Sequence, residues 1–336
     1  MQHIFSGCNL QSVLPLKTWN TSSVTDLSAA FSENGNLKSL AGLENWDTSN
    51  VTKFTKETSD SGIFSYCTSL SDISALTNWN TSNAVYAQGM FKDCQNISDI
   101  SALANWNTGN LQNASYMFYE CEKLSSLVPL TNWDMRKVTN LSDMFFGCAI
   151  STLNGLQNWQ LGNVVMMSRM FKNNDPLKDI SALSGWFTET SNLKDISGLF
   201  TSAWNLADIS ALRNWKVDHV INMSRTFDDT GMKSLEALSS WNVSNVTDMS
   251  MAFRHVDDLT ALEGLENWDV SNVKNFSQIF ANNKNLADAS QINDWNIASG
   301  NNFTKMFCIE NVGHCALPEF SKRKGSFDND GTFIPE

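Results

Sequence analysis

Large apolar residues recur along this chain with a period of about 27 residues. Successive tryptophans from Trp19 to Trp295 are spaced by 27, 33, 27, 27, 26, 27, 29, 26, 27 and 27 residues. Phenylalanines keep the same beat from Phe5 to Phe307. A fixed period of this length is typical of a solenoid, in which each repeat forms one coil. We therefore expect one buried row of tryptophans: Trp19, Trp46, Trp79, Trp106, Trp133, Trp159, Trp186, Trp215, Trp241, Trp268 and Trp295.

Between each phenylalanine and the next tryptophan lies an apolar triplet with a spacing of three, such as Leu70-Ile73-Leu76. The segment is too short for a helix between two turns, and it fits a leucine-rich-repeat template. We predict a short strand around Asp72–Ser74, with the equivalent strands of neighbouring coils paired in a parallel sheet.

A second apolar set lies between each tryptophan and the next phenylalanine, as in Val246-Met249-Ala252-Phe253. This spacing predicts a short helix or 3₁₀ turn with one apolar face. Because one such unit cannot bury its apolar side alone, the units must stack. The predicted fold is an α/β solenoid of about 11–12 coils, with a parallel sheet on one face and short helical or 3₁₀ turns on the other.

The period predicts one leucine-rich-repeat-like solenoid over residues 1–307, followed by a C-terminal cap and the start of a linker over residues 308–336. The chain enters partway through a coil, with no polar segment before Phe5. Terminal coils need caps. We therefore expect a fragment of a longer chain, or a first coil that a partner or another domain covers.

Composition narrows the function. The net charge of −12 disfavours nucleic acid, which requires clustered lysine and arginine. No segment approaches the length of an apolar membrane helix, and the N-terminus lacks the pattern of a signal peptide. We find no motif that unites unlike catalytic groups, and the histidines do not cluster with cysteine or aspartate. The sequence therefore predicts no enzyme, no cofactor and no metal site.

The repeats resemble the bacterial-surface 26-residue repeat of the BspA-like leucine-rich-repeat proteins. The phrase "WDTSNVT" stands at Trp46–Thr52 and "MFKDCQNI" at Met90–Ile97, and the likeness extends over residues 4–307. The period of this chain is mostly 27, one residue longer than in that repeat. The resemblance implies a right-handed superhelix, display on a cell surface, no enzymatic activity and, in some members, adhesion to matrix proteins.

Cysteines form a second row, three residues after a framework phenylalanine. We expect buried free thiols there rather than bridges between coils. Cys308 and Cys315 lie off this row, and a disulfide between them would close the cap. The row members are Cys8, Cys67, Cys94, Cys121 and Cys148.

One row on the predicted sheet combines aspartate with serine and faces away from the core by strand alternation. It is either a solvated surface or a ligand platform, and calcium on Asp72 and Asp99 is a weaker alternative. A segment near the C-terminus, Asp328–Thr332, resembles half of a calcium loop. The candidate ligand-binding aspartates are Asp72, Asp99, Asp179 and Asp208.

Aromatic residues also stand where other coils have polar ones. Tyr119 and Phe146 follow the framework phenylalanine on adjacent coils, and Trp204 stands four residues after Phe200. Exposed aromatic residues anchor interfaces, although packing against a neighbouring loop is the alternative. Two insertions, in Thr52–Gly62 and Phe187–Ser191, lengthen the same part of the coil.

The pattern therefore predicts a non-enzymatic binding scaffold, an adhesin-type surface module that recognises protein or matrix ligands. A structural spacer and a carbohydrate-binding solenoid are the alternatives. We expect a protein or glycan partner at a cell surface, and no insertion into the membrane. The expected location is a cell surface or secretion as part of a larger chain, and the alternative is the cytoplasm.

Overall fold

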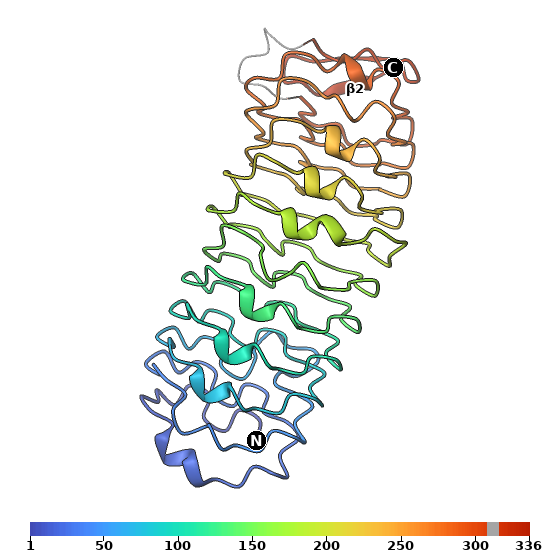
Figure 1. Ribbon diagram of the computed structural model, residues 1–336. Helices are drawn as coiled ribbons and strands as arrows, with labels where there is room; N and C mark the ends of the chain where they lie inside the picture. Colours follow the sequence, from blue (N-terminus) through green and yellow to red (C-terminus); the bar gives the residue numbers. More distant parts are fainter. Residues whose placement is uncertain (308–315) are drawn as a thin grey trace. The chain divides into compact units, whose positions relative to one another are not determined.

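The computed structural model describes residues 1–307 and 316–336, which form two compact units, Met1–Val164 and Val165–Glu336. Figure 1 shows successive coils stacked within each unit. This is the predicted leucine-rich-repeat-like solenoid. Short 3₁₀ helices and one terminal hairpin are the regular elements of the described part. They are η1 (Leu14–Thr18), η2 (Ser74–Leu76), η3 (Ser101–Leu103), η4 (Val128–Leu130), η5 (Ser181–Gly185), η6 (Ser210–Leu212), η7 (Glu236–Leu238), η8 (Ser290–Ile292), β1 (Gly325–Phe327) and β2 (Phe333–Pro335).

Rows of aromatic side chains fill the core. Neighbouring tryptophan rings stack, as between Trp106 and Trp133, whose centroids are 6.4 Å apart with a 2° angle between the rings. Buried indole N–H groups find acceptors one coil earlier; that of Trp133, for example, donates to the carbonyl of Leu103 at 3.0 Å. A buried indole needs such a partner. The aromatic row is thus also a hydrogen-bonded ladder between coils.

The predicted burial of the tryptophan row is confirmed from Trp46 to Trp295, where the side chains are at most 6% exposed. The prediction is wrong for Trp19, which is 39% exposed. Its ring stacks on Trp46 on one side, at 6.5 Å, and meets Phe5 of its own coil in a tilted contact at 5.6 Å. Trp204 stands outside the row, as predicted, and is 57% exposed.

The placement of strand and turn within a coil is the reverse of the prediction. The segment around Asp72–Ser74 makes one isolated parallel bridge, Ser39 with Asp72, and then enters the 3₁₀ helix η2 at Ser74. The Asp72 carboxylate starts this helix, because it accepts the backbone N–H of Ser74 at 3.0 Å. Such an Asx turn competes with extension of a strand.

Backbone pairing between coils is concentrated instead in the tryptophan-to-phenylalanine segment, where a helical turn was predicted. There Leu27 N–H donates to Lys53 O at 2.8 Å and Phe31 N–H to Ile63 O at 2.9 Å. The strand-like pairing stays limited to single parallel bridges, such as Asp26 with Lys53. The described coils therefore contain a ladder of bridges rather than the continuous sheet that we predicted.

Left-handed residues explain why the pairing is interrupted. In most coils, positions two before and two after the framework phenylalanine have positive φ, as at Ala29 (51°) and Glu33 (62°) around Phe31. A left-handed residue turns an extended chain sharply. Two such turns per coil prevent a long strand from forming in the segment around the framework phenylalanine.

A third corner follows each tryptophan. In most coils the side chain of the next residue accepts the backbone N–H two positions later, as Asp47 does from Ser49 at 2.9 Å. Asparagines link the corners of adjacent coils: Asn50 Nδ2 donates to Ser22 O at 2.8 Å. Short polar side chains therefore shape the corners and satisfy their backbone groups.

The C-terminal hairpin packs on the last framework aromatics. Phe333 of β2 meets Phe303 edge-on at 5.4 Å, and Phe327 of β1 meets Phe307 at 5.5 Å. The β1–β2 turn contains the segment that resembles a calcium loop. In it, Asp328 Oδ1 accepts the backbone N–H groups of Asp330 and Thr332, so this carboxylate is part of the turn.

Candidate functional site

The most exposed tryptophan of the described residues, Trp204, stands at the mouth of a cavity in the second unit. The cavity has a volume of about 340 Å³ and draws on three successive coils. Its lining consists of Trp204, Asp229, Thr230, Gly231, His255, Asp257 and Asp258.

Hydrogen bonds hold the Trp204 ring in place. Its indole Nε1 donates to Asp229 Oδ2 at 2.7 Å, and Ser202 Oγ lies 3.2 Å from the same oxygen. Gly231 lets the next coil approach closely, because a Cβ there would lie 2.3 Å from the Trp204 carbonyl oxygen. The N–H edge of the indole ring is thus fixed by a hydrogen bond, while the ring itself remains exposed to solvent.

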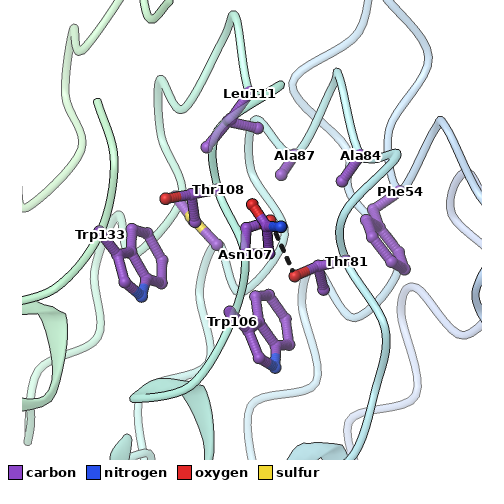
Figure 2. Close-up of a pocket in the computed structure, with 10 residues that line it drawn as sticks. Phe54, Thr81, Ala84, Ala87, Trp106, Asn107, Thr108, Leu111 and Trp133 are labelled. Carbon is purple, nitrogen blue, oxygen red and sulfur yellow. Dashed lines mark hydrogen bonds between the residues drawn. The ribbon is translucent and has the colours of Figure 1, made fainter. Parts of the chain in front are cut away.

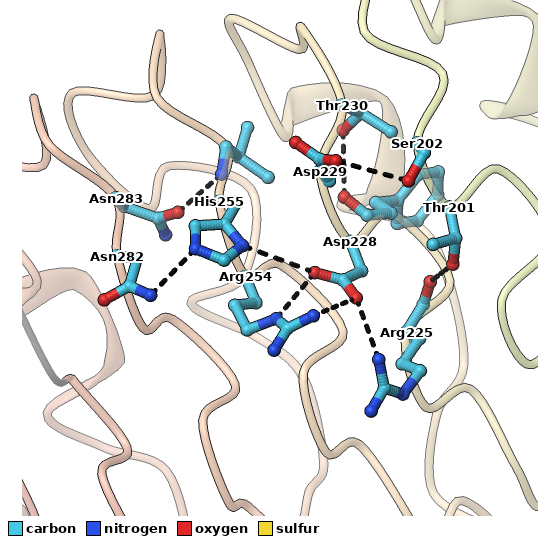
Figure 3. A network of polar contacts seen from close by, with 12 residues as sticks. Thr201, Ser202, Arg225, Asp228, Asp229, Thr230, Arg254, His255, Asn282 and Asn283 are labelled. Carbon is cyan, nitrogen blue, oxygen red and sulfur yellow. Dashed lines mark hydrogen bonds and ion pairs between the residues drawn. The ribbon is translucent and has the colours of Figure 1, made fainter. Parts of the chain in front are cut away.

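A buried charge network lies beside the cavity (Figure 3). Asp228, 1% exposed, accepts two hydrogen bonds of 2.8 Å from Arg254. Arg225 lies 3.3 Å from the same carboxylate. His255 Nδ1 is 4.0 Å from it, while His255 Nε2 contacts Asn282 Nδ2 at 2.8 Å. A buried carboxylate with a bidentate guanidinium fixes its neighbours in one geometry. The network therefore orients His255 at the cavity wall.

Lysines reach two of the cavity carboxylates from outside. Lys284 Nζ lies 2.7 Å from Asp257 Oδ2, and Lys233 Nζ lies 3.8 Å from Asp258 Oδ2. Both lysine side chains are about 70% exposed. Exposed ion pairs of this kind contribute only about 0–1 kcal/mol. The carboxylates are thus weakly engaged.

The other predicted aromatics, Tyr119 and Phe146, stack in the first unit with centroids 4.6 Å apart. Both are half-buried, and a cation of the chain itself occupies the spot. Lys92 Nζ lies 5.5 Å from the centroid of the Tyr119 ring and 5.2 Å from that of Tyr116. Asp60, from the longer of the two insertions, forms an ion pair with Lys92. This aromatic pair is thus packed by a loop, which is the alternative that the sequence left open.

The structure joins Tyr119 and Phe146 to each other, whereas Trp204 belongs to the other compact unit. The four candidate aspartates all make the same local contact. Each accepts the backbone N–H of a serine two residues later, at 2.8–3.0 Å, and so begins a 3₁₀ helix. Hydrogen bonds from Ser39 and Ser74 lower the pKa of Asp72. Asp208 also lines a shallow second cavity with Arg213 and Glu236.

The cysteine row consists of free thiols, as predicted, with one exception to its burial. Cys67, Cys94, Cys121 and Cys148 are buried, whereas Cys8 is exposed. Each buried thiol donates to the phenylalanine carbonyl of an earlier coil, as Cys94 does to Phe64 O at 3.1 Å. Burial raises the pKa of Cys67 to about 12 and that of Cys94 well above its ordinary value. Cys308 and Cys315 lie outside the described residues.

A small internal cavity lies between coils of the first unit (Figure 2). Its volume is about 10 Å³, room for no more than one water. Phe54 lines it and stacks on both Trp79 and Trp106, at 5.7 and 6.3 Å. Small neighbours, Ala84 and Ala87, make space for this ring. The cavity is a packing gap rather than a ligand site.

Sequence reasoning found Trp204 but missed its partners. Asp229, His255 and the pair Asp257–Asp258 come from the two coils that follow Trp204. The signal was the sequences "DDTG" and "HVDD", which place acidic residues at equivalent turns of adjacent coils. In the residues that the structure describes, no group of three or more His, Cys, Asp or Glu side chains is arranged to hold a metal ion. Over the same residues, no helix is long and apolar enough to span a membrane.

Comparison with solved structures finds distant likenesses. An internalin from Listeria monocytogenes is 17% identical, with a TM-score of 0.40, over 90% of this chain and 86% of that one. A leucine-rich repeat protein from Bacteroides ovatus is 13% identical, with a TM-score of 0.35, over 85% and 69%. A leucine-rich cell surface protein from Faecalibacterium prausnitzii is 13% identical, with a TM-score of 0.31, over 82% and 74%. Because these TM-scores are low, we assign the solenoid fold from the coil geometry described above and not from these likenesses.

No curated protein matches the chain. One family does match, over four overlapping ranges: residues 1–128, 57–150, 125–236 and 223–312. These ranges cover nearly all the coils. The chain belongs to the family described as "Mycoplasma protein of unknown function, DUF285".

Proposed function

We propose that this chain is a non-enzymatic binding scaffold, an adhesin-type module that recognises protein or matrix ligands. We place it at a cell surface or in a secreted chain, as part of a larger protein. The observation that carries the proposal is Trp204, 57% exposed and held by Asp229 beside a cavity of about 340 Å³. Aromatic residues with a fixed ring offer large contact area at low entropy cost.

The resemblance to BspA-like repeats supports the surface location, because that resemblance implies display on a cell surface. The repeat architecture supports binding, since stacked coils present their corner residues on a rigid frame. A structural spacer has no use for an exposed tryptophan beside a ligand-sized cavity, and Trp204 therefore favours the scaffold over the spacer.

The test is capture of immobilised collagen, fibronectin and fibrinogen by the intact chain, measured by surface plasmon resonance beside a glycan array. We expect binding to at least one matrix protein, with affinity reduced about tenfold or more in Trp204→Ser, as for an interface hot spot. Ile221→Ser is the matched control, because Ile221 is also exposed (47%) but lies outside the cavity lining.

Three results would count against the proposal. Binding to glycans alone would favour the carbohydrate-binding alternative. Absence of binding to any probe would favour the spacer. Equal binding by Trp204→Ser and the parent chain would remove Trp204 from the contact and direct attention to the insertion at Thr52–Gly62. Thermal unfolding of each variant checks that the fold is intact.

A further inference from the structure

We propose that the Trp204 cavity binds a guanidinium group, the side chain of an arginine presented by a protein partner. This inference rests on the proposed function and names the ligand chemistry of the same site. The donors and acceptors of the cavity wall decide which ligand chemistry fits.

Two side-chain donors of the cavity lining, Trp204 Nε1 and Thr230 Oγ1, are already engaged. Trp204 Nε1 donates to Asp229, and Thr230 Oγ1 donates to the carbonyl of Phe227 at 2.9 Å. His255 Nε2 accepts from Asn282 Nδ2 at 2.8 Å, and His255 Nδ1 lies 4.0 Å from Asp228. A sugar hydroxyl both donates and accepts, and it would find few free donors here. A ligand that only donates suits this wall better.

Acceptors, by contrast, remain available. The hydrogen bonds that Asp229 receives from described residues end on Oδ2, so Oδ1 is open to a ligand. Asp257 contributes charge rather than a free acceptor, because its Oδ1 is buried and its Oδ2 pairs with Lys284. Asp258 meets only a distant lysine, at 3.8 Å. Three carboxylates, two of them with spare acceptors, and no lysine or arginine in the described lining make this an anionic cavity.

The exposed indole selects a cation that can lie flat. A cation over the face of a tryptophan gains electrostatic attraction to the ring. Guanidinium is planar, stacks on aromatic faces and carries five donors in a fixed fork that matches carboxylates. Ammonium lacks the planar fork. The combination of an indole face and carboxylates on two following coils therefore favours arginine over lysine.

The first unit contains an occupied counterpart of this arrangement. There the chain's own Lys92 lies 5.5 Å from the ring centroids of Tyr66 and Tyr119, and Asp60 neutralises it. The Lys92 side chain is only 13% exposed. Aromatic rings and a carboxylate at this turn of the coil thus hold a cation. The Trp204 cavity has the same kinds of group, but the lysines that reach its carboxylates, Lys233 and Lys284, are about 70% exposed and are not part of its described lining.

The test uses the intact chain with ¹⁵N-labelled tryptophan and follows the Trp204 indole N–H signal, which Trp204→Phe identifies by its absence. The probes are N-acetyl-arginine amide, the neutral isostere N-acetyl-citrulline amide, N-acetyl-lysine amide and methyl glucoside. We expect a saturable shift with the arginine probe and, since citrulline has lost the charge, binding at least about tenfold weaker with citrulline. Added salt should weaken the arginine response, because exposed charges are screened.

Variants sharpen the test. Asp257→Asn with Asp258→Asn should weaken arginine binding about tenfold, by removing two charges from the wall. Lys233→Met with Lys284→Met should strengthen it about threefold, because those lysines compete for the same carboxylates. Glu189→Gln is the control, since Glu189 is an exposed carboxylate of the same unit outside the lining.

The outcomes separate this inference from the function that it rests on. Equal shifts with arginine and citrulline, a shift with methyl glucoside alone, or no shift with any probe would each overturn the assignment of guanidinium. If the parent chain captures a matrix protein through Trp204 while the arginine probe gives no shift, the binding function stands and the ligand chemistry is wrong. If the arginine probe shifts Trp204 but no matrix protein is captured, the cavity chemistry stands alone.

Discussion

At the scale of single residues, a buried tryptophan or cysteine of a coil does two things. It fills the core and it satisfies a polar group of the preceding coil. Trp133 stacks on Trp106 and donates to Leu103, while the Cys94 thiol packs in the core and donates to Phe64. Periodicity predicted the packing but not these hydrogen bonds, because spacing contains no information about which atoms of adjacent coils meet.

Replacing Trp133 with alanine should destabilise the protein by roughly 3–5 kcal/mol, the usual cost of removing a buried large aromatic side chain. The side chain is 3% exposed, and its loss also removes one of the two hydrogen bonds that the Leu103 carbonyl accepts, the other coming from the Trp106 backbone N–H. Urea unfolding followed by circular dichroism measures the change. The control is Trp204→Ser, whose effect should stay within about 0.5 kcal/mol as for a surface substitution. A small change in the free energy of unfolding of Trp133→Ala would mean that the core tolerates the loss of one stacked tryptophan.

The thiols should differ sharply in reactivity. The reactive species is the thiolate. Burial suppresses it at Cys67, Cys94, Cys121 and Cys148, whereas Cys8 is exposed. At pH 8 a disulfide reagent should label Cys8 quickly and the four buried thiols only after denaturation. Peptide mass mapping of the native protein tests this, and rapid labelling of Cys94 would contradict the described packing.

At the scale of elements, the coil is defined by corners rather than by strands and helices. Two Asx turns, one after the tryptophan and one before the 3₁₀ helix, and two left-handed residues around the phenylalanine bend the chain in most coils. Corner residues are short, polar and locally bonded. They resemble loop residues in composition, and this is why the apolar spacing suggested a strand and a helix in the wrong segments.

The left-handed positions offer a way to change stability. Gln278 has φ of 55°, a conformation that costs a non-glycine residue about 1–2 kcal/mol. Gln278→Gly relieves this cost but adds unfolded-chain entropy of roughly 0.5–1 kcal/mol. We expect a net gain of about 0.5–1 kcal/mol, the difference between those two ranges.

The reverse change should be unfavourable. Gly7 has φ of 66° and open space around its Cβ position, with its nearest neighbour 3.9 Å away, so Gly7→Ala adds backbone strain without a clash. Thermal melts of the two variants should therefore move in opposite directions. A lower melting temperature for Gln278→Gly would show that its side-chain contacts outweigh the backbone strain.

At the scale of the whole molecule, the repeated aspartate corners make stability sensitive to acid. Hydrogen bonds from Ser49 lower the pKa of Asp47, those from Ser271 lower the pKa of Asp269, and Arg136 lowers that of Asp134 to about 2. A carboxyl whose folded pKa is depressed stabilises the fold above its ordinary pKa of 3.8. That contribution is lost as the pH falls through the folded value.

We therefore expect the urea midpoint to fall between pH 4 and about pH 2, since many corners lose their carboxylates together. Asp47→Asn with Asp134→Asn and Asp269→Asn should flatten this fall, because asparagine forms the same turn without titrating. Other coils already use asparagine in this way: Asn20, Asn80 and Asn107. An unchanged acid slope in the triple variant would assign the acid sensitivity to other groups.

The sequence by itself determined the coils and their core. Large apolar residues recur in fixed register, and one coil cannot bury them alone, so the coils must stack. It also singled out Trp204, whose position four residues after Phe200 breaks that register. The order of bridge and 3₁₀ helix within a coil was decided by the tertiary structure, because local Asx bonds and left-handed turns compete with strand extension.

The cavity was likewise decided only by folding. Its carboxylates lie 25 to 54 residues beyond Trp204 in the chain, and stacking of the coils brings them beside the indole ring. A one-dimensional pattern shows which positions are equivalent between coils. The pattern does not show which side chains then meet, which donors are already bonded or which acceptors stay free. These depend on how adjacent coils stack in three dimensions.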